Sequence, residues 1–414
     1  LRYGLEDESS RINLNALLIV DKQMENGGRQ LLMALPGMTE EIADAIMDWL
    51  DEDDEPREFG AELEYYSSLT PPYAPKNGPL ETVEELLLIR GIRENPFLLF
   101  GADPYRNGIP MMNSPTGVST SASTALADVE QDPAAARGWA SQFTLFSQEH
   151  NVNSSGLKRI HVNQEDMNRL YEELRTVLND EWSTYIVAYR QNGPSTSESD
   201  ASGTVGGKLD LSQPGQFPLI QVLDLVDTQV SVTFQGANES TLLQSPIRTE
   251  TLGLALPLLM DNLSTSNART LPGRININQA SRTLLLGIPG MDKETVGTII
   301  SRRDIVPDDN DPNRRFETWI LAEGIVDLET MRTLLPFVSV GGDVYRAQII
   351  GYFQGGGVQS RAEVVLDATK ELPGILFWRD ISHLPHGYPI EILGVDFGEQ
   401  AIPGAAATSA LNLR

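Results

Sequence analysis

The stretch LPGMTEEIADAIMDWLDEDDE, residues 35–55, begins like a helix-hairpin-helix, a unit best known for binding nucleic-acid phosphates. A Pro-Gly turn leads into an amphipathic helix that carries Ile42, Ile46 and Trp49 on one face. Yet residues 30–55 hold nine acidic side chains and no Lys or Arg. Phosphate binding needs basic neighbours, so the stretch predicts the hairpin and argues against its best-known ligand.

The whole chain is acidic. It has 414 residues with 31 Lys plus Arg and 58 Asp plus Glu, a formal net charge of −27. Such a charge repels polyphosphates at long range and attracts cations. The absence of cysteine excludes disulfides, thiolate catalysis and cysteine metal sites. Because neither a nucleophile elbow nor a phosphate-binding glycine motif is present, we expect no enzymatic activity.

One short pattern occurs three times, as RINLNA, RIHVNQ and RININQ, beginning at residues 11, 159 and 274. Each copy alternates like a short strand and ends in Asn beside a helical stretch. We therefore expect these asparagines to cap the helices that follow, which applies to Asn15, Asn163 and Asn278.

The first and third copies share a longer module. LLMALPGM at residue 31 aligns with LLLGIPGM at residue 284, and Thr39 and Asp292 are predicted to cap the helices behind the two Pro-Gly turns. The second copy has Asn179-Asp180 in place of Pro-Gly, so we interpret it as a degenerate relative. These modules predict repeated helix-hairpin-helix-like units.

The C-terminal part predicts a sheet. YRAQIIGYF from Tyr345 and SRAEVVLDA from Ser360 alternate like strands around a glycine loop, and ILFWRDI and YPIEIL, from residues 375 and 388, supply further strands. The fold class is therefore α+β, helical modules joined to a small antiparallel sheet.

The predicted organisation follows these signals. Residues 1–15 start the sheet, three modules occupy the helical part, Ser-rich linkers separate them, and the strands come last. In order, the predicted segments are 1–15, 16–110 with the acidic loop, the linker 111–140, the degenerate module 141–193, the linker 194–217, a mixed region 218–270, the third module 271–340, the strands 341–398 and the tail 399–414.

The acidic run at residues 51–55 is the sharpest local signal. It lies where a helix ends, and a helix C-terminus carries partial negative charge that disfavours carboxylates. Only Arg57 is near enough in sequence to compensate. A divalent cation would resolve the conflict: Asp51 and Asp53 alternate, and Glu62 can return across the turn at Gly60. Oxygen ligands in a loop favour Ca²⁺. A solvated acidic loop is the alternative.

A second acidic loop follows the matching helix of the third copy. It carries Asp308, Asp309 and Asp311 and is a weaker candidate for the same kind of metal site.

An alternative function is nucleic-acid binding through the third copy, as in a helix-hairpin-helix protein of the DNA-uptake type. Residues 281–304 have four basic and three acidic side chains, which is little positive charge for a phosphate site. Arg302 and Arg303 are equally explained as cations at a helix C-terminus.

Several of these motifs resemble the K-type minor pseudopilins of the type II (general) secretion system. The resemblance is carried by RINLNAL, LPGMTEEIADAIMDWLDEDDEPREFGAELEYYS and PPYAPKNGPLETVEELLLIRGI, and again by RININQASRTLLLGIPGM, FETWILAEGI, YRAQIIGYF and ILFWRD. It covers roughly residues 1–100 and 270–380. The region between is longer than the resemblance leads us to expect.

The resemblance implies a pilin-like antiparallel sheet into which a large helical domain is inserted. It implies a structural protein at the tip of the pseudopilus, beside the I-type and J-type minor pseudopilins and other pseudopilus subunits, supporting protein export across the outer membrane. The protein would be periplasmic and held in the inner membrane by an N-terminal helix that this sequence, beginning at Leu1, lacks. It also implies calcium in the helical domain, with Asp51, Asp53, Asp54 and Glu62 as ligands.

Overall fold

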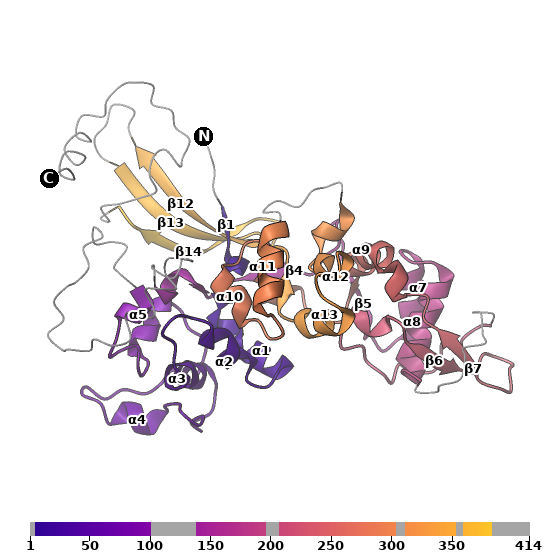
Figure 1. The fold of residues 1–414 in the computed structure, drawn as a ribbon, viewed down its shortest axis with the longest axis horizontal. Helices are drawn as coiled ribbons and strands as arrows, with labels where there is room; N and C mark the ends of the chain where they lie inside the picture. The colour runs from indigo at the N-terminus through magenta and orange to yellow at the C-terminus, as the bar shows by residue number, and fades with distance from the viewer. Residues whose placement is uncertain (1–4, 101–137, 196–206, 304–310, 353–358, 383–414) are drawn as a thin grey trace. The chain divides into compact units, whose positions relative to one another are not determined.

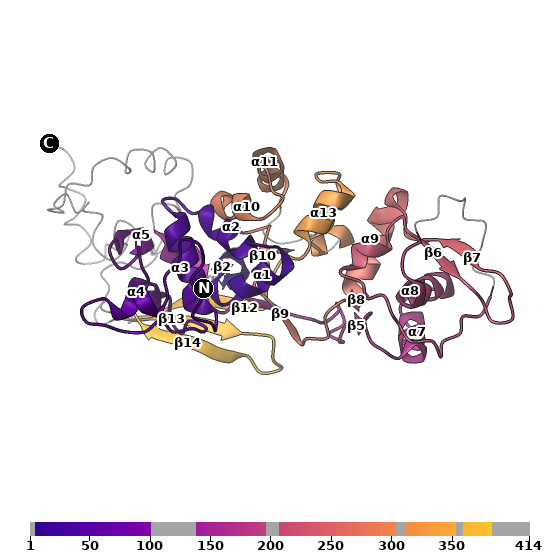
Figure 2. The same cartoon turned by 90° about the horizontal axis from the view of Figure 1, so that it is seen from below.

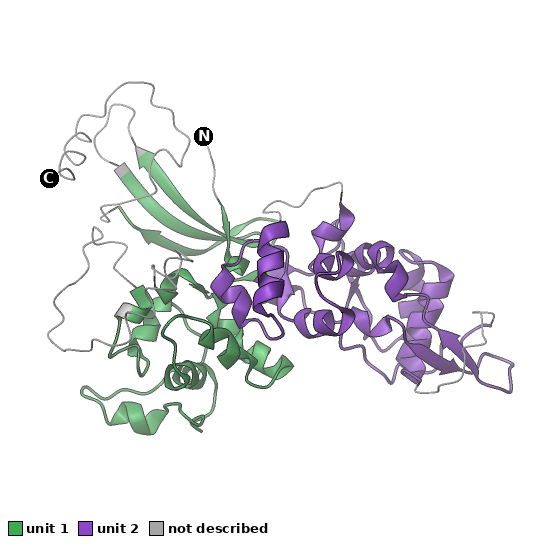
Figure 3. Cartoon of the chain, viewed as in Figure 1, with its two compact units in different colours: residues 1–148, 342–414 green, residues 149–341 purple. Residues whose placement is uncertain are grey.

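The computed structural model describes residues 5–100, 138–195, 207–303, 311–352 and 359–382. The chain forms two compact units, residues 1–148 with 342–414 and residues 149–341 (Figure 3). The strand predicted from residue 388, the predicted tail, most of the linker 111–140 and residues 196–206 of the linker 194–217 lie outside the described residues. Among the residues described, no helix has both the length and the apolar character that crossing a membrane requires.

The first unit is built around an antiparallel sheet with the strand order β1-β12-β13-β14 (Figures 1 and 2). The strands are β1 (Glu6–Asp7), β12 (Val344–Tyr352), β13 (Gln359–Asp367) and β14 (Gly374–Asp380). The predicted hairpin and third strand are thus confirmed. Because β1 precedes the helices and the other strands follow them, the helical part is inserted between neighbouring strands of one sheet.

The helices of this unit gather on one side of the sheet in both views (Figures 1 and 2). Their buried apolar side chains, such as Leu17, Leu31 and Ile46, form the core. The elements are η1 (Glu8–Ser10), β2 (Ile12–Asn13), η2 (Leu14–Ala16), α1 (Leu17–Gln23), α2 (Gly27–Met33), α3 (Glu40–Leu50), α4 (Leu63–Ser67), η3 (Val83–Leu88), α5 (Phe97–Phe100), η5 (Trp139–Ser141) and β3 (Phe143–Thr144).

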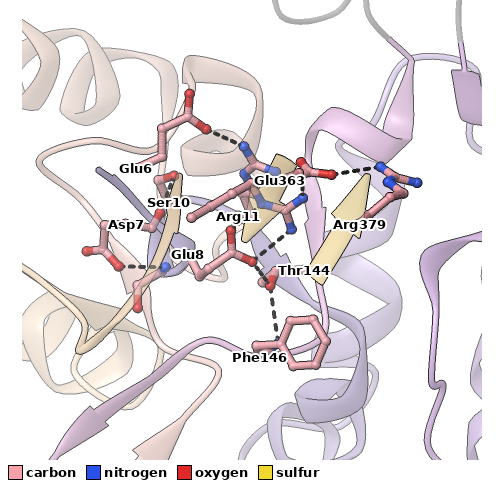
Figure 4. Close-up of polar contacts among 11 residues, drawn as sticks. Glu6, Asp7, Glu8, Ser10, Arg11, Thr144, Phe146, Glu363 and Arg379 are labelled. Carbon is pink, nitrogen blue, oxygen red and sulfur yellow. Dashed lines mark hydrogen bonds and ion pairs between the residues drawn. The ribbon is translucent and has the colours of Figure 1, made fainter. Parts of the chain in front are cut away.

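A chain of alternating charges fastens the sheet to these elements. Arg346 on β12 lies between Glu8 at 2.7 Å and Glu363 at 2.8 Å, and Glu363 also accepts a hydrogen bond from Arg379 of β14 at 2.8 Å. Glu8 is fully buried and also accepts a hydrogen bond from the Thr144 hydroxyl (Figure 4). Burial, the largest single influence, would raise the pKa of Glu363, but Arg346 and Arg379 together outweigh it and lower that pKa below its ordinary value.

The second unit is mainly helical (Figure 1). The strand β4 (Gln148–His150), with two of its three residues in this unit, pairs with β9 (Thr270–Pro272). The other elements are β5 (Ile160–His161), α7 (Met167–Arg175), α8 (Asp180–Asn192), η6 (Val222–Leu225), β6 (Gln229–Val232), β7 (Thr241–Gln244), η7 (Thr249–Thr251), α9 (Leu252–Asn262), β8 (Leu263–Ser264), β10 (Ile275–Asn276), α10 (Arg282–Gly287), α11 (Lys293–Arg302), η8 (Pro312–Arg315), α12 (Trp319–Ala322), α13 (Leu328–Leu334) and β11 (Val338–Ser339).

Each copy of the repeated motif forms a short strand that pairs with a second strand later in the chain. The three short strands of the copies pair in parallel with a strand that follows their helices: β2 with β3, β5 with β8 and β10 with β11. A parallel pair needs a long crossover connection, and the helices of each segment supply it. The second copy closes in the same way, which is consistent with its interpretation as a relative of the others.

The prediction that the motif asparagines cap helices is wrong. Thr39 and Asp292 do cap α3 and α11, but the caps after the other two motif copies are Asp166 for α7 and Ser281 for α10. In the first copy, Asn13 caps η2 by accepting from the Asn15 N–H.

Two of these asparagines instead hold a distant backbone segment with both ends of the amide. The Asn15 amide donates to the Leu80 carbonyl at 3.0 Å and accepts from the Leu80 N–H at 2.7 Å. Asn163 makes the same pair of bonds to Leu219, at 2.8 Å and 2.9 Å. Asn278 makes no such pair of bonds within the described residues, and its backbone N–H donates to the Asn276 side chain.

Asn163→Asp should therefore lower the free energy of unfolding by about 2 kcal/mol, because the carboxylate cannot donate to the Leu219 carbonyl. The reverse exchange nearby, Asp166→Asn, should change it by less than about 0.5 kcal/mol, because Asn and Asp serve equally well at an N-cap. Urea unfolding followed by circular dichroism measures both. Equal losses in the two variants would contradict the assigned roles.

Candidate cation-binding loop

The acidic loop is built on α3. Its Thr39 cap, with Glu40 and Glu41 in the first turn, starts the helix, and Ile42, Ile46 and Trp49 are buried as predicted. Two aspartates one turn apart, Asp44 and Asp48, are buried as well. Amphipathic spacing does not predict this, because a loop that follows the helix covers them.

That loop folds back onto the helix through its own backbone. The Phe59 N–H donates to Asp44 at 3.2 Å, and the Ala61 N–H donates to Asp48 at 2.8 Å. A Cβ atom on Gly60 would lie 1.8 Å from the Asp48 carboxylate, so only glycine fits between these two bonds. Buried carboxylates thus shape the loop that carries residues 51–62.

Arg57 supplies the compensating charge that the sequence predicted. Its guanidinium lies 2.9 Å from Asp48 and 2.5 Å from Asp51. Burial is the largest influence on both carboxyl groups and keeps their pKa values above the ordinary one, although Arg57 lowers them. Arg57 bonds one oxygen of Asp51, while the other, Oδ1, is buried without a hydrogen-bond partner.

Glu62 returns toward the acidic run, as predicted. It is 4% exposed, and both oxygens of its carboxylate are buried without a hydrogen-bond partner. Burial, followed by the negative charges of Asp48, Asp51, Asp54 and Asp53, raises the pKa of Glu62 to about 7. A buried carboxylate without partners is costly unless it takes up a proton or meets a cation.

The remaining two predicted ligands lie at the exposed tip. Asp53 accepts from the Glu55 N–H at 2.9 Å, and Asp54 accepts from the side chain of Asn77 at 2.9 Å. The Asn77 amide also donates to the Asp53 carbonyl at 2.8 Å, and its own oxygen is buried without a partner. Sequence analysis missed Asn77; its only signal is the Asn-Gly pair, whose Asn adopts φ +48°.

As the side chains lie, no three carboxylate or imidazole groups of the described residues converge into a metal-binding group. The loop nevertheless offers oxygen donors that lack partners: Glu62 Oε1 and Oε2, Asp51 Oδ1 and Asn77 Oδ1. Oxygen donors of this kind suit a hard cation such as Ca²⁺, which accepts carboxylate and amide oxygens in a flexible loop. The donor set therefore fits the predicted ion.

Most of the second acidic loop lies outside the residues that the structure describes. Asp308 and Asp309 are not among the described residues. Asp311 accepts from the Asn313 N–H at 3.0 Å and caps η8, a structural role.

The basic residues named for nucleic-acid binding are engaged within the protein. Arg303 donates to the carbonyls of Ile277 and Ala280, at 3.2 Å and 2.7 Å, and Arg302 lies 3.8 Å from Glu323. The Pro-Gly turns also make contacts within the protein, although Gly37 and Gly290 are exposed. A Cβ on Gly290 would lie 3.3 Å from Thr333, and the Pro36 carbonyl accepts from the Trp139 indole at 2.9 Å.

The segment that carries this loop is similar to segments of known proteins. Residues 10–98 match the family model described as type II secretion system (T2SS), protein K. The chain is 38% identical over 105 residues to the putative type II secretion system protein K of Escherichia coli strain K12. It is 36% identical over 87 residues to the type II secretion system protein K of Klebsiella pneumoniae.

These alignments span 23% and 21% of this chain, and 32% and 25% of the two relatives. A chain of the solved GspK-GspI-GspJ complex from the enterotoxigenic Escherichia coli type 2 secretion system matches with a TM-score of 0.36 and 12% identity. That match covers 91% of this chain and 78% of the other, and its TM-score is too low to equate the two folds.

The match of residues 10–98 to the protein K family model, together with the two relatives, confirms the resemblance seen in the motifs of this segment.

Glu62 should make the stability of the cation-free protein depend on pH. Its folded-state pKa of about 7 lies above the ordinary 4.5, so the folded state keeps a proton that the unfolded state releases. In chelator, the free energy of unfolding should fall as the pH rises from about 5 to about 8, by at most about 3 kcal/mol from this group.

Glu62→Gln removes the titrating group and should flatten that dependence, while Asp48 and Asp51 contribute alike to both proteins. Urea unfolding across this pH range, with a chelator present, measures the difference. Identical slopes for wild type and variant would contradict the buried, unpaired state of Glu62.

Proposed function

We propose that this protein is a minor pseudopilin, a structural subunit at the tip of the type II secretion pseudopilus that supports protein export across the outer membrane. The observation that carries the proposal is the match of residues 10–98 to the protein K family, since those residues form the helices and acidic loop of the first unit. The order of the strands supports it, because one sheet with a helical insertion is the arrangement that the resemblance implies.

The proposed partners are the I-type and J-type minor pseudopilins and other pseudopilus subunits. The proposed location is the periplasm, with the full-length protein anchored in the inner membrane by an N-terminal helix. The proposed role is assembly, without catalysis. The engagement of Arg302 and Arg303 inside the third module argues against the alternative role in nucleic-acid binding.

Mixing this chain with the periplasmic domains of its I-type and J-type counterparts, at about 10 μM each, should give one complex in size-exclusion chromatography. The major pseudopilin serves as a control for nonspecific association and should elute separately. Separate elution of all three minor pseudopilins would overturn the proposed partnership, and a shift of duplex DNA by this chain alone would favour the alternative function.

The acidic loop is proposed to bind Ca²⁺ through Asp51, Asp53, Asp54 and Glu62, with Asn77 as a further oxygen donor. Support comes from the partnerless buried oxygens of Glu62, Asp51 and Asn77. Asp53 and Asp54 are exposed and would have to turn toward Glu62. The ion would supply positive charge at the end of α3, where the helix dipole and five successive acids leave an excess of negative charge.

Calcium should raise the melting temperature, with a gain in stability of about 2.7 kcal/mol when its concentration is a hundred times its Kd. Asp51→Ala combined with Asp53→Ala should abolish the calcium-dependent rise. The matched control, Glu52→Ala with Glu55→Ala, removes two acids from the same loop and should keep it. Equal melting in calcium and in chelator would remove the site.

A further inference from the structure

The acidic loop is tied to a second segment, residues 77–88, rather than ending in solvent. Asn77 holds Asp53 and Asp54 through one amide nitrogen, and the next N–H, that of Gly78, donates to the Trp49 carbonyl at 3.3 Å. A movement of the Asp54 side chain or of the Asp53 backbone therefore acts directly on Asn77.

The chain between Asn77 and the helix η3 has little freedom. The side-chain amide of Asn15 forms hydrogen bonds with both the N–H and the carbonyl of Leu80. Glu85 closes a capping box by accepting from the N–H groups of Glu81 and Thr82, at 2.7 Å and 3.1 Å. Lys76 adds an ion pair to Glu85 at 3.0 Å. A displacement at Asn77 is thus passed to η3 instead of being absorbed by a loose connection.

η3 in turn reaches the sheet. Glu84 accepts from Arg379 of β14 at 2.7 Å, and Arg379 continues to Glu363 and so into the chain of alternating charges (Figure 4). β14 pairs with β13 on one side, and no described strand pairs with its other side. An edge strand of this kind opens more readily than the centre of a sheet, so one added contact changes its local stability.

We propose that cation binding at the acidic loop is coupled to the stability of strand β14 through Asn77, η3 and the Glu84–Arg379 ion pair. The inference rests on the proposed cation site. It assigns cation binding at the loop an effect on the stability of β14, a strand that the loop itself does not contact in the hydrogen bonds named above. Glu84 is a positioning residue, because it acts on β14 through Arg379. The coupling is reciprocal, so a ligand that stabilises β14 also tightens cation binding. Ile375 and Trp378, exposed on β14, are held in a defined position when the loop is loaded.

Hydrogen–deuterium exchange with mass spectrometry tests the coupling, with CaCl₂ or a chelator added to the whole chain. In the wild type, calcium should slow exchange in residues 49–62 and 77–88, and should slow exchange in β14 about fivefold. Glu84→Gln should keep the protection of the loop and lose that of β14. The matched control is Glu81→Gln, an exposed acid of the same segment, which should behave like the wild type.

The outcomes separate the coupling from the site. Protection of the loop without protection of β14 in the wild type would overturn the coupling and leave the cation site standing. Full protection of β14 in Glu84→Gln would overturn the route through η3. No calcium-dependent protection anywhere would overturn the cation site and the coupling with it.

Discussion

The structure of the first module depends on burying negative charge where α3 ends. Asp44 and Asp48 of α3 are removed from water, and Asp48 lies in the last turn of the helix, where the dipole disfavours a carboxylate. Backbone N–H groups of the following loop bond both carboxylates, Arg57 pairs with Asp48, and Arg29 lies 3.3 Å from Asp44, so these buried charges fix the path of the loop. The compensation stops short of Glu62. One carboxylate is therefore left without a partner near four others, and that imbalance is what the proposed cation would relieve.

In the second and third modules, the corresponding helix ends carry an arginine instead of acids. In the third module, Arg303 follows α11 and donates to the Ile277 carbonyl of its own RININQ motif and to the Ala280 carbonyl just after it. In the second, Arg190 near the end of α8 donates to the Val162 carbonyl of RIHVNQ at 2.8 Å. An arginine at this place closes the helix pair onto its own opening strand and needs no ligand. In the first module α3 ends at Leu50 and acids follow it, so the helix pair depends on positive charge from elsewhere.

The parts of the fold that the sequence could predict are those fixed by neighbours in the chain. Alternation identified β12, β13 and β14, and Thr39 and Asp292 were recognised as caps because a cap bonds three residues ahead. The error at Asn15 and Asn163 has the opposite cause. Their partners lie 65 and 56 residues away, and an Asn before a helix has the same local appearance whether it caps or reaches out.

The candidate site shows the same division. Asp51, Arg57 and Glu62 were found because the charge conflict at a helix end can be read over a dozen residues. Asn77 was not, because it meets the loop only after the chain has formed α4 and returned. The burial of Asp44 and Asp48 was not predicted either, since it depends on a loop whose course the sequence pattern does not specify.

The chain of charges from Glu84 to Glu8 defines position more than it adds stability. A buried ion pair recovers little beyond its cost of desolvation, so replacing these five residues with apolar ones of similar size could make the protein as stable or more so. Alternating charges, however, match in only one register: a shift of β14 by one residue would turn Arg379 away from both Glu84 and Glu363. The first strand of this unit is separated from the next by the whole helical insertion. Apolar contacts alone would not select one strand register, whereas the alternating charges do. The same arrangement makes the edge strand responsive, because its alignment depends on a partially exposed pair held by η3, a segment that also holds the acidic loop.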